Sequence, residues 1–160
     1  MLNRQIIVLV VILAALSSGI YYFVILDHNT SITNINTTDV SSIYVFSVDK
    51  ELLDLKKEDN HWNILVDNQY YLANQKKVQA ILKLLKAQPV QSFNVGAADF
   101  PKYGFNKPHL RVRFDDLSIR FGDVNPLNNL RYIKIYDTVY LIKDEYYRLL
   151  LSRPQDLRQN

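Results

Sequence analysis

The pattern of hydrophobic and polar positions divides the chain into three parts. An uncharged apolar stretch of 21 residues runs from Ile6 to Leu26, a polar run occupies residues 27–39, and mixed sequence continues to residue 160. At 1.5 Å rise per residue, such a helix reaches about 31 Å, close to the thickness of a bilayer core. The pattern predicts an N-terminal transmembrane helix in residues 1–26, a polar tether over 27–39 and one domain over 40–160.

Period-two alternation in the first half of the domain predicts three strands, over residues 43–48, 53–55 and 62–66. The charged turn over residues 56–60 joins the second of these to the third as a hairpin. Asn74 then caps a predicted helix that Pro89 ends. The apolar positions of this helix repeat at i, i+3, i+4 and i+7, namely Val78, Ile81, Leu82 and Leu85.

The second half alternates more regularly and predicts a hairpin over residues 110–121, with Asp115 and Asp116 at its turn. Two short strands over 131–136 and 139–142 follow, and Asp144 caps a last helix that stops near Pro154. The order β-β-β-α-β-β-β-β-α predicts the α+β class, with two helices that cover antiparallel sheet segments.

The apolar stretch has two interpretations. A cleaved secretory signal is one, because Ala15-Leu16-Ser17 resembles a cleavage site. Apolar sequence resumes at Ile20, however, and a mature soluble terminus would expose it, which favours an uncleaved signal anchor. Arg4 precedes the stretch, so the positive-inside rule places the N-terminus in the cytoplasm. The prediction is a single-pass protein of the cytoplasmic (inner) membrane, with its domain on the periplasmic or extracytoplasmic side.

Two segments of the domain carry a family resemblance. They are Tyr103-Gly104-Phe105-Asn106-Lys107-Pro108 and Phe121-Gly122-Asp123-Val124-Asn125-Pro126, and Arg131-Tyr132-Ile133 and Val139-Tyr140-Leu141-Ile142 follow them. In this order and spacing, with Trp62 upstream, the chain resembles the bacterial domain of unknown function 4340 (DUF4340) family, in a single short copy. The resemblance implies an envelope-associated protein with one N-terminal span, and some relatives accompany ABC-type transporters. It implies no catalytic residue.

The motif residues have structural explanations. Gly104 is expected at positive φ in a turn closed by Pro108, and Gly122 is expected to let the chain leave its strand. Turn formers such as Asn125 and Pro126 then favour a structural loop over a ligand loop. The residues that we assign to this structural motif are Trp62, Tyr103, Gly104, Pro108, Gly122, Asp123, Asn125, Pro126, Arg131 and Tyr132.

Signatures of enzymes and of metal or cofactor sites are missing from the sequence. Its four glycines are too sparse for a phosphate-cradling loop, and its three histidines have no pairing on a helix face. The chain has no cysteine, so an exported domain depends on its packed core. We therefore predict no catalytic residue, no cofactor and no metal, with a hydrolase at an unrecognised site as an open alternative.

One predicted surface suggests binding. Basic residues interleave with tyrosines on the outward face of the second sheet segment, and this arrangement suits anionic head groups, glycans or an acidic partner. A solvated sheet face, or one covered by the last helix, is the structural alternative. The residues of the predicted face are Arg111, Arg113, Arg120, Tyr132, Lys134 and Tyr136.

Net charge and predicted location limit the kinds of partner that we expect. Apart from Arg4, 18 basic residues stand against 16 acidic ones, so bulk charge does not favour nucleic acid. The leading prediction is a noncatalytic scaffold or accessory module of a membrane complex, with the bilayer bound through Ile6 to Leu26 and a membrane or envelope protein as partner. Binding of anionic lipid head groups or glycans by the basic-tyrosine face is the alternative.

Overall fold

The computed structural model describes residues 4–27, 31–48 and 50–159. The chain divides into two compact units, Met1–Thr30 and Ser31–Asn160. The first contains the helix α1 (Arg4–Asp27), whose sequence lacks charge between Arg4 and Asp27. In the part of the chain that the structure describes, none of the helices combines the length and the apolarity that a membrane crossing requires.

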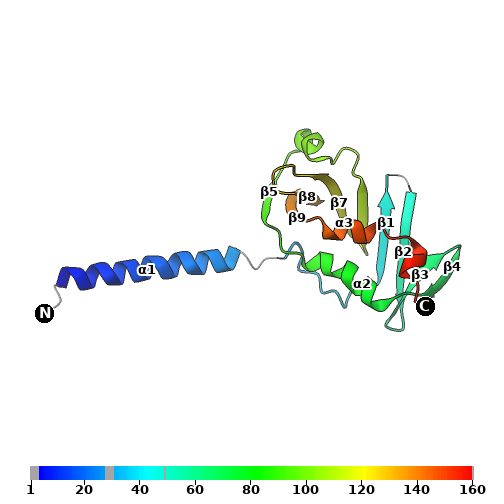
Figure 1. Cartoon of the computed structure of the whole chain (residues 1–160), viewed down its shortest axis with the longest axis horizontal. Coiled ribbons are helices and arrows are strands. Elements are labelled where there is room, and N and C mark those ends of the chain that lie inside the picture. Colours follow the sequence, from blue (N-terminus) through cyan, green and yellow to red (C-terminus); the bar gives the residue numbers. More distant parts are fainter. Residues whose placement is uncertain (1–3, 28–30, 49, 160) are drawn as a thin grey trace. The chain divides into compact units, whose positions relative to one another are not determined.

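The second unit is an α+β domain, as the sequence predicts (Figure 1). Its first half contains a run of four strands, each paired with the next, then a helix and a short strand. The bounds are β1 (Ser42–Ser47), β2 (Lys50–Glu58), β3 (His61–Val66), β4 (Gln69–Leu72), α2 (Gln75–Leu82), the 3-10 helix η1 (Lys83–Lys86) and β5 (Gln91–Asn94).

Its second half contains four strands between short helices. The bounds are η2 (Ala97–Tyr103), β6 (Leu110–Phe114), β7 (Leu117–Val124), β8 (Leu130–Ile135), β9 (Thr138–Lys143), α3 (Glu145–Leu150) and α4 (Pro154–Leu157). All nine strands form one sheet in the order β4-β3-β2-β1-β6-β7-β8-β9-β5, and every neighbouring pair is antiparallel.

The main core lies between one face of the sheet and the helices α2 and α3 (Figure 1). Alternate residues of each strand face it, because side chains of a strand point to opposite faces in turn. In the helices, Val78, Ile81 and Leu82 of α2 and Leu150 of α3 are buried in the same cluster. The predicted cap of α2 is confirmed, since the Asn74 side chain accepts a hydrogen bond from the backbone N–H of Lys77.

Four elements of the domain are absent from the prediction: β4, β5, η2 and α4, which begins at Pro154, where the predicted last helix stops. β4 closes a hairpin whose turn residues, Asp67 and Asn68, both have positive φ. Such a turn matches the twist of paired strands, and Asp and Asn tolerate its geometry. β5 adds an edge strand beside β9. Pairing of β1 with β6 joins the two predicted sheet segments into one continuous sheet.

The tether is shorter in the structure than the polar pattern predicts. Ile32 is only 4% exposed, and its backbone N–H donates to the carbonyl of Ala87 at 3.0 Å. The Thr33 hydroxyl donates to the carbonyl of Leu85 at 3.0 Å. The segment from Ser31 onward therefore belongs to the domain, which corrects the predicted boundary at residue 40.

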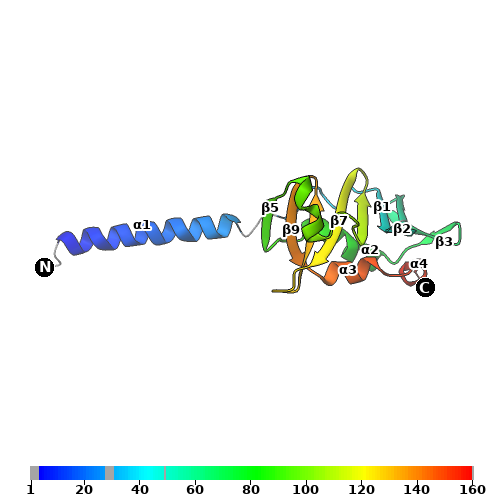
Figure 2. The ribbon, with the colours of Figure 1, turned by 90° about the horizontal axis from the view of Figure 1, so that it is seen from above.

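The C-terminal segment closes the sheet edge at β4. The backbone N–H of Asn74 donates to the Leu157 carbonyl, and that of Gln159 donates to the Leu72 carbonyl. Figure 2 shows α4 beside the β3 end of the domain. The prediction that Asp144 caps the last helix is wrong in one respect, because its side chain makes no cap hydrogen bond and pairs with Arg131 instead.

Candidate functional site

The sheet face opposite the main core carries three of the predicted arginines. Strand register places Arg111 of β6 directly opposite Arg120 of β7. Arg113, two residues along β6, lies opposite Tyr44 of β1, and its guanidinium carbon is 4.5 Å from the centre of that ring. Side chains of directly opposed residues on neighbouring strands have Cβ atoms about 5 Å apart. The fold therefore gathers these guanidinium groups on one small area.

These three arginines are exposed to solvent. Among the described residues, no hydrogen bond or salt bridge joins the guanidinium group of Arg111, Arg113 or Arg120 to another group. Tyr44 and Phe46 lie beside them on β1 with stacked rings, their centres 6.4 Å apart. We call Arg111, Arg113 and Arg120, with Tyr44 and Phe46, the arginine face.

The remaining three residues of the predicted basic-tyrosine face do not extend the exposed row of arginines, which corrects that prediction. Lys134 lies opposite Arg120 as the pattern requires, but it is buried under the ring of Phe100, 4.5 Å away. Tyr132 is half-buried and packs edge-on against Tyr103, with 4.9 Å between ring centres. Tyr136 is 77% exposed, but it sits in the β8–β9 turn at φ 50° and does not continue the row.

The short helix η2 causes this difference. Its Phe100 and Tyr103, with Phe105 after it, form an aromatic cover over the β8–β9 end of the face. Val139 and Leu141 are buried on this side without joining the main core. The one available sequence signal was the spacing of Phe100, Tyr103 and Phe105 around Pro101, which does not say which surface they cover.

Two cations under or near this cover are fully engaged. Lys134 donates to the backbone carbonyl of Tyr136 and lies 3.7 Å from an Asp137 carboxylate oxygen. Arg131, on the main-core side, pairs through Nε with Asp144 and donates to the Gly122 carbonyl at 2.6 Å. Its guanidinium also stacks on Tyr147 at 3.7 Å. Both groups therefore have structural roles.

The two predicted motif glycines allow the end of η2 and β7 to approach each other closely. Gly104 has φ 77°, as predicted, and the Asp123 carboxyl group packs against the place where a Cβ would be. Gly122 differs from the prediction, because β7 continues through it to Val124. A Cβ at Gly122 would lie 2.0 Å from the Tyr103 carbonyl oxygen, so close backbone approach is the reason for this glycine.

The other motif residues are structural too. Trp62 is buried in β3, and Pro108 lies in the connection between η2 and β6. Asn125 accepts from the backbone N–H of Leu127 through its side chain and donates its own N–H to the Leu130 carbonyl. These Asx-type bonds explain the loop after β7, where Pro126 also lies, without a ligand.

An acidic flank borders the arginine face on β2. Asp54 lies opposite Tyr44 and accepts a hydrogen bond from the Tyr70 hydroxyl at 2.8 Å, while its other oxygen is buried without a partner among the described atoms. Burial raises the pKa of Glu51, and the charge of Asp54 raises it further. Lys56 of β2 lies over the Tyr70 ring, 5.0 Å from its centre, so β2 carries both acidic and basic groups beside the arginine face.

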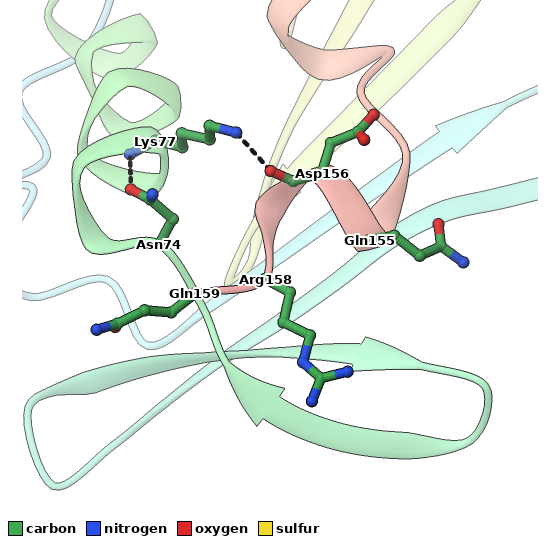
Figure 3. A pocket seen from close by; sticks show the side chains of 6 residues that line it. All are labelled: Asn74, Lys77, Gln155, Asp156, Arg158 and Gln159. Carbon is green, nitrogen blue, oxygen red and sulfur yellow. Dashed lines mark hydrogen bonds between the residues drawn. The ribbon is translucent and has the colours of Figure 1, made fainter.

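A second candidate site is a shallow depression of about 480 Å³ beside the C-terminal segment (Figure 3). Lys77 crosses it and donates from Nζ to the Asp156 carbonyl at 2.5 Å, while Arg158 stacks on Tyr71 at 3.8 Å. Ligand pockets are usually apolar with a few convergent polar groups, whereas polar, engaged side chains line this one. The depression fits a role in holding the C-terminal segment. Its lining residues are Asn74, Lys77, Gln155, Asp156, Arg158 and Gln159.

Groups that enzymes use are sparse in the described region. Across residues 4–27, 31–48 and 50–159, no cluster of three or more His, Cys, Asp or Glu side chains could hold a metal ion. His109 Nε2 lies 3.1 Å from an Asp123 carboxylate oxygen, with both side chains about half-exposed. No hydroxyl among the described hydrogen bonds reaches the His109 ring, so this pair lacks a nucleophile.

Fold and face together define an α+β domain with one nine-stranded antiparallel sheet, helices on one side, and a partly covered, partly cationic opposite side. The family model for the domain of unknown function DUF4340 matches residues 71–160, which is more than half of the chain. The chain therefore belongs to this family, as the motif resemblance indicates. The match contains η2, the two glycines and all three arginines, whereas Trp62 precedes it. Neither a curated protein nor a solved structure matches the chain.

Proposed function

We propose that this protein is a noncatalytic binding module whose arginine face engages an anionic partner. One observation carries the proposal: Arg111 and Arg120 lie directly opposite each other, exposed, and no described residue neutralises them. Like charges in opposed positions of a sheet destabilise it by a few tenths to about 1 kcal/mol. An anion bound between the two arginines would turn this repulsion into attraction.

The chemistry of the face suits phosphate or carboxylate groups. A guanidinium group offers a planar fork of donors that matches these anions in a bidentate way. Contact with the Tyr44 ring restricts Arg113, so less side-chain freedom would be lost when it binds. The noncatalytic assignment stays a prediction from the sequence.

The location is the second part of the proposal. It rests on the sequence of α1, in which 21 consecutive uncharged residues from Ile6 to Leu26 follow Arg4. We infer a signal anchor in the cytoplasmic membrane, an extracytoplasmic domain and an accessory role in a membrane or envelope protein complex, with transporters among the candidate associates. The arginine face would then meet acidic or phosphorylated groups on the extracytoplasmic side of the membrane.

A polyanion titration of the full-length protein in neutral detergent tests the binding proposal. With inorganic polyphosphate as the probe, we expect salt-sensitive binding that weakens about 10-fold in the double variant Arg111→Gln/Arg120→Gln. The matched control is Lys76→Gln/Lys83→Gln, which removes the same charge from exposed positions at the two ends of α2.

The control should keep its affinity within about twofold, because its lysines lie outside the arginine face. Equal losses in the two double variants would show that net charge alone attracts the probe and would contradict the proposal. The double variant is expected to fold. Removal of Arg120 relieves a like-charge pair, so the free energy of unfolding should stay unchanged or rise slightly.

A further inference from the structure

We infer that the arginine face docks on the phosphate head groups of the bilayer that holds α1. This inference rests on the proposed function and names its anionic partner as the membrane surface. The reasons are the shape of the face, its composition, and the short link between the two units of the chain.

The shape of the face suits a planar partner. It consists of alternate side chains from three adjacent strands, β1, β6 and β7, and the aromatic cover lies over β8 and the Gly122 end of β7. The depression at the C-terminal segment contains no residue of these three strands. An open sheet surface presents its cations side by side, which matches a layer of head groups better than a single small ligand.

The composition of the face points the same way. Arginine and aromatic side chains are the pair that favours the interface between water and lipid, since the rings accept partial burial and the cations reach phosphate. Tyr44 and Phe46 are half-buried. They lie directly opposite Arg113 and Arg111 on the neighbouring strand. Each basic residue near an anionic membrane surface contributes about a fivefold gain in binding, equivalent to about 1 kcal/mol.

The length of the link keeps the domain close to the bilayer. Because Ser31 already belongs to the domain, only residues 28–30 connect it to α1, in place of the 13 residues of the predicted tether. A fully extended chain of three residues reaches at most about 11 Å. A domain on so short a link experiences a high effective concentration of head groups, so even weak contacts would be occupied.

The test uses the full-length protein in nanodiscs and one introduced cysteine, which is unique because the chain has none. A fluorophore at Ser118→Cys, opposite Arg113 on the sheet, reports contact between the face and spin-labelled head groups. The matched control is Gln79→Cys on the exposed side of α2. Discs contain phosphatidylcholine alone or with a third of phosphatidylglycerol.

We expect quenching at Ser118→Cys, but not at Gln79→Cys, only in discs with phosphatidylglycerol and only at low salt. Adding Arg111→Gln/Arg120→Gln should weaken the contact about 25-fold, from about fivefold for each arginine. Equal quenching at both positions, or quenching at Ser118→Cys that ignores phosphatidylglycerol, would overturn the inference.

The same samples separate this inference from the function on which it rests. If polyphosphate binds to the arginine face in detergent while the Ser118→Cys label stays unquenched in anionic discs, the membrane is the wrong partner and the binding function stands. If polyphosphate does not bind either, both fail. Release of the protein from the discs by alkaline carbonate would overturn the anchor, and with it this inference.

Discussion

The two ends of the outer sheet face carry similar residues, but one end is buried and the other is exposed. On β8, Lys134 is buried beneath Phe100 and bound to a backbone carbonyl. On the neighbouring strand β7, Arg120 lies directly opposite it, exposed and without a described partner. Both positions have the same place in the alternation of their strands. The difference is the aromatic cover, which lies over β8 and Gly122 of β7 and leaves Arg120 and the arginines of β6 open.

This contrast separates structural cations from candidate binding cations. A buried cation must be paired, because removal from water costs more than a lone charge can recover. Lys134 and Arg131 meet that requirement with carbonyl, carboxylate and aromatic contacts. An exposed cation needs no partner in the fold and can bind an external one. The open end of the face is therefore where function is expected.

The largest expected loss of stability comes from a substitution that disrupts the covered end of the face. Gly122→Ala would place a Cβ 2.0 Å from the Tyr103 carbonyl oxygen and 2.9 Å from the Phe105 ring. Backbone must move to relieve this overlap, so we expect the free energy of unfolding to fall by about 3 kcal/mol. Urea denaturation of the full-length protein, followed by the fluorescence of its single Trp62, measures the loss.

Gly96→Ala is the matched control for this prediction. No heavy atom lies within 4 Å of a Cβ at that position, and the stability should change by less than about 0.5 kcal/mol. A Gly122→Ala protein as stable as the Gly96→Ala protein would mean that the cover does not press on β7 as described.

A smaller loss of stability is expected when a hydrogen-bonded arginine is replaced, and almost none when an exposed arginine is replaced. Arg131→Met keeps most of the apolar volume but leaves the Gly122 carbonyl and Asp144 without their donor. Loss of one partner from a fully buried pair costs about 3–5 kcal/mol, and since the Asp144 side chain is one third exposed we expect about 2 kcal/mol. Arg111→Met should change stability by less than about 0.5 kcal/mol in the same urea experiment. Equal losses would remove the distinction between structural and binding cations.

The smallest expected effect concerns the hydrogen bonds that join the β6–β7 turn to the start of β1 at the open end of the face. Asp115, at the β6–β7 turn, accepts hydrogen bonds from the backbone and hydroxyl groups of Ser41 and Ser42. Burial alone would raise the pKa of Asp115, but these hydrogen bonds outweigh it and hold the pKa below its ordinary value of 3.8. Because the folded pKa is lowered, the stabilisation is present above pH 3.8 and disappears as the pH falls through the folded pKa.

We therefore expect Asp115→Asn to cost about 1 kcal/mol at neutral pH and progressively less below pH 3.8. Denaturation curves of both proteins across that range provide the measurement. Asp116→Asn, at the exposed neighbouring position, is the control and should show no such dependence. A cost for Asp115→Asn that stays constant into acid would mean that the charge of Asp115 is not what holds β1.

Local patterns in the sequence predicted most of the individual elements. Alternation located β1, β3, β6, β7, β8 and β9, and helical spacing after Asn74 located α2, because these signals act over a few neighbouring residues. β4 and β5 are only four residues long, too short for a clear period. The positive φ of Gly104 was predictable from its turn, whereas the close approach at Gly122 depends on a segment that is distant along the chain.

By itself, the sequence determined the α+β class, the family and the row of alternating basic residues, because residue identity and spacing carry that information directly. Only the tertiary structure decided that Ser31 to Asp39 belong to the domain, that η2 covers Tyr132 and Lys134, and that Arg111, Arg113 and Arg120 remain open. The physical reason is that exposure is a property of what packs over a residue. A strand pattern specifies two faces, but long-range contacts choose which part of a face meets solvent.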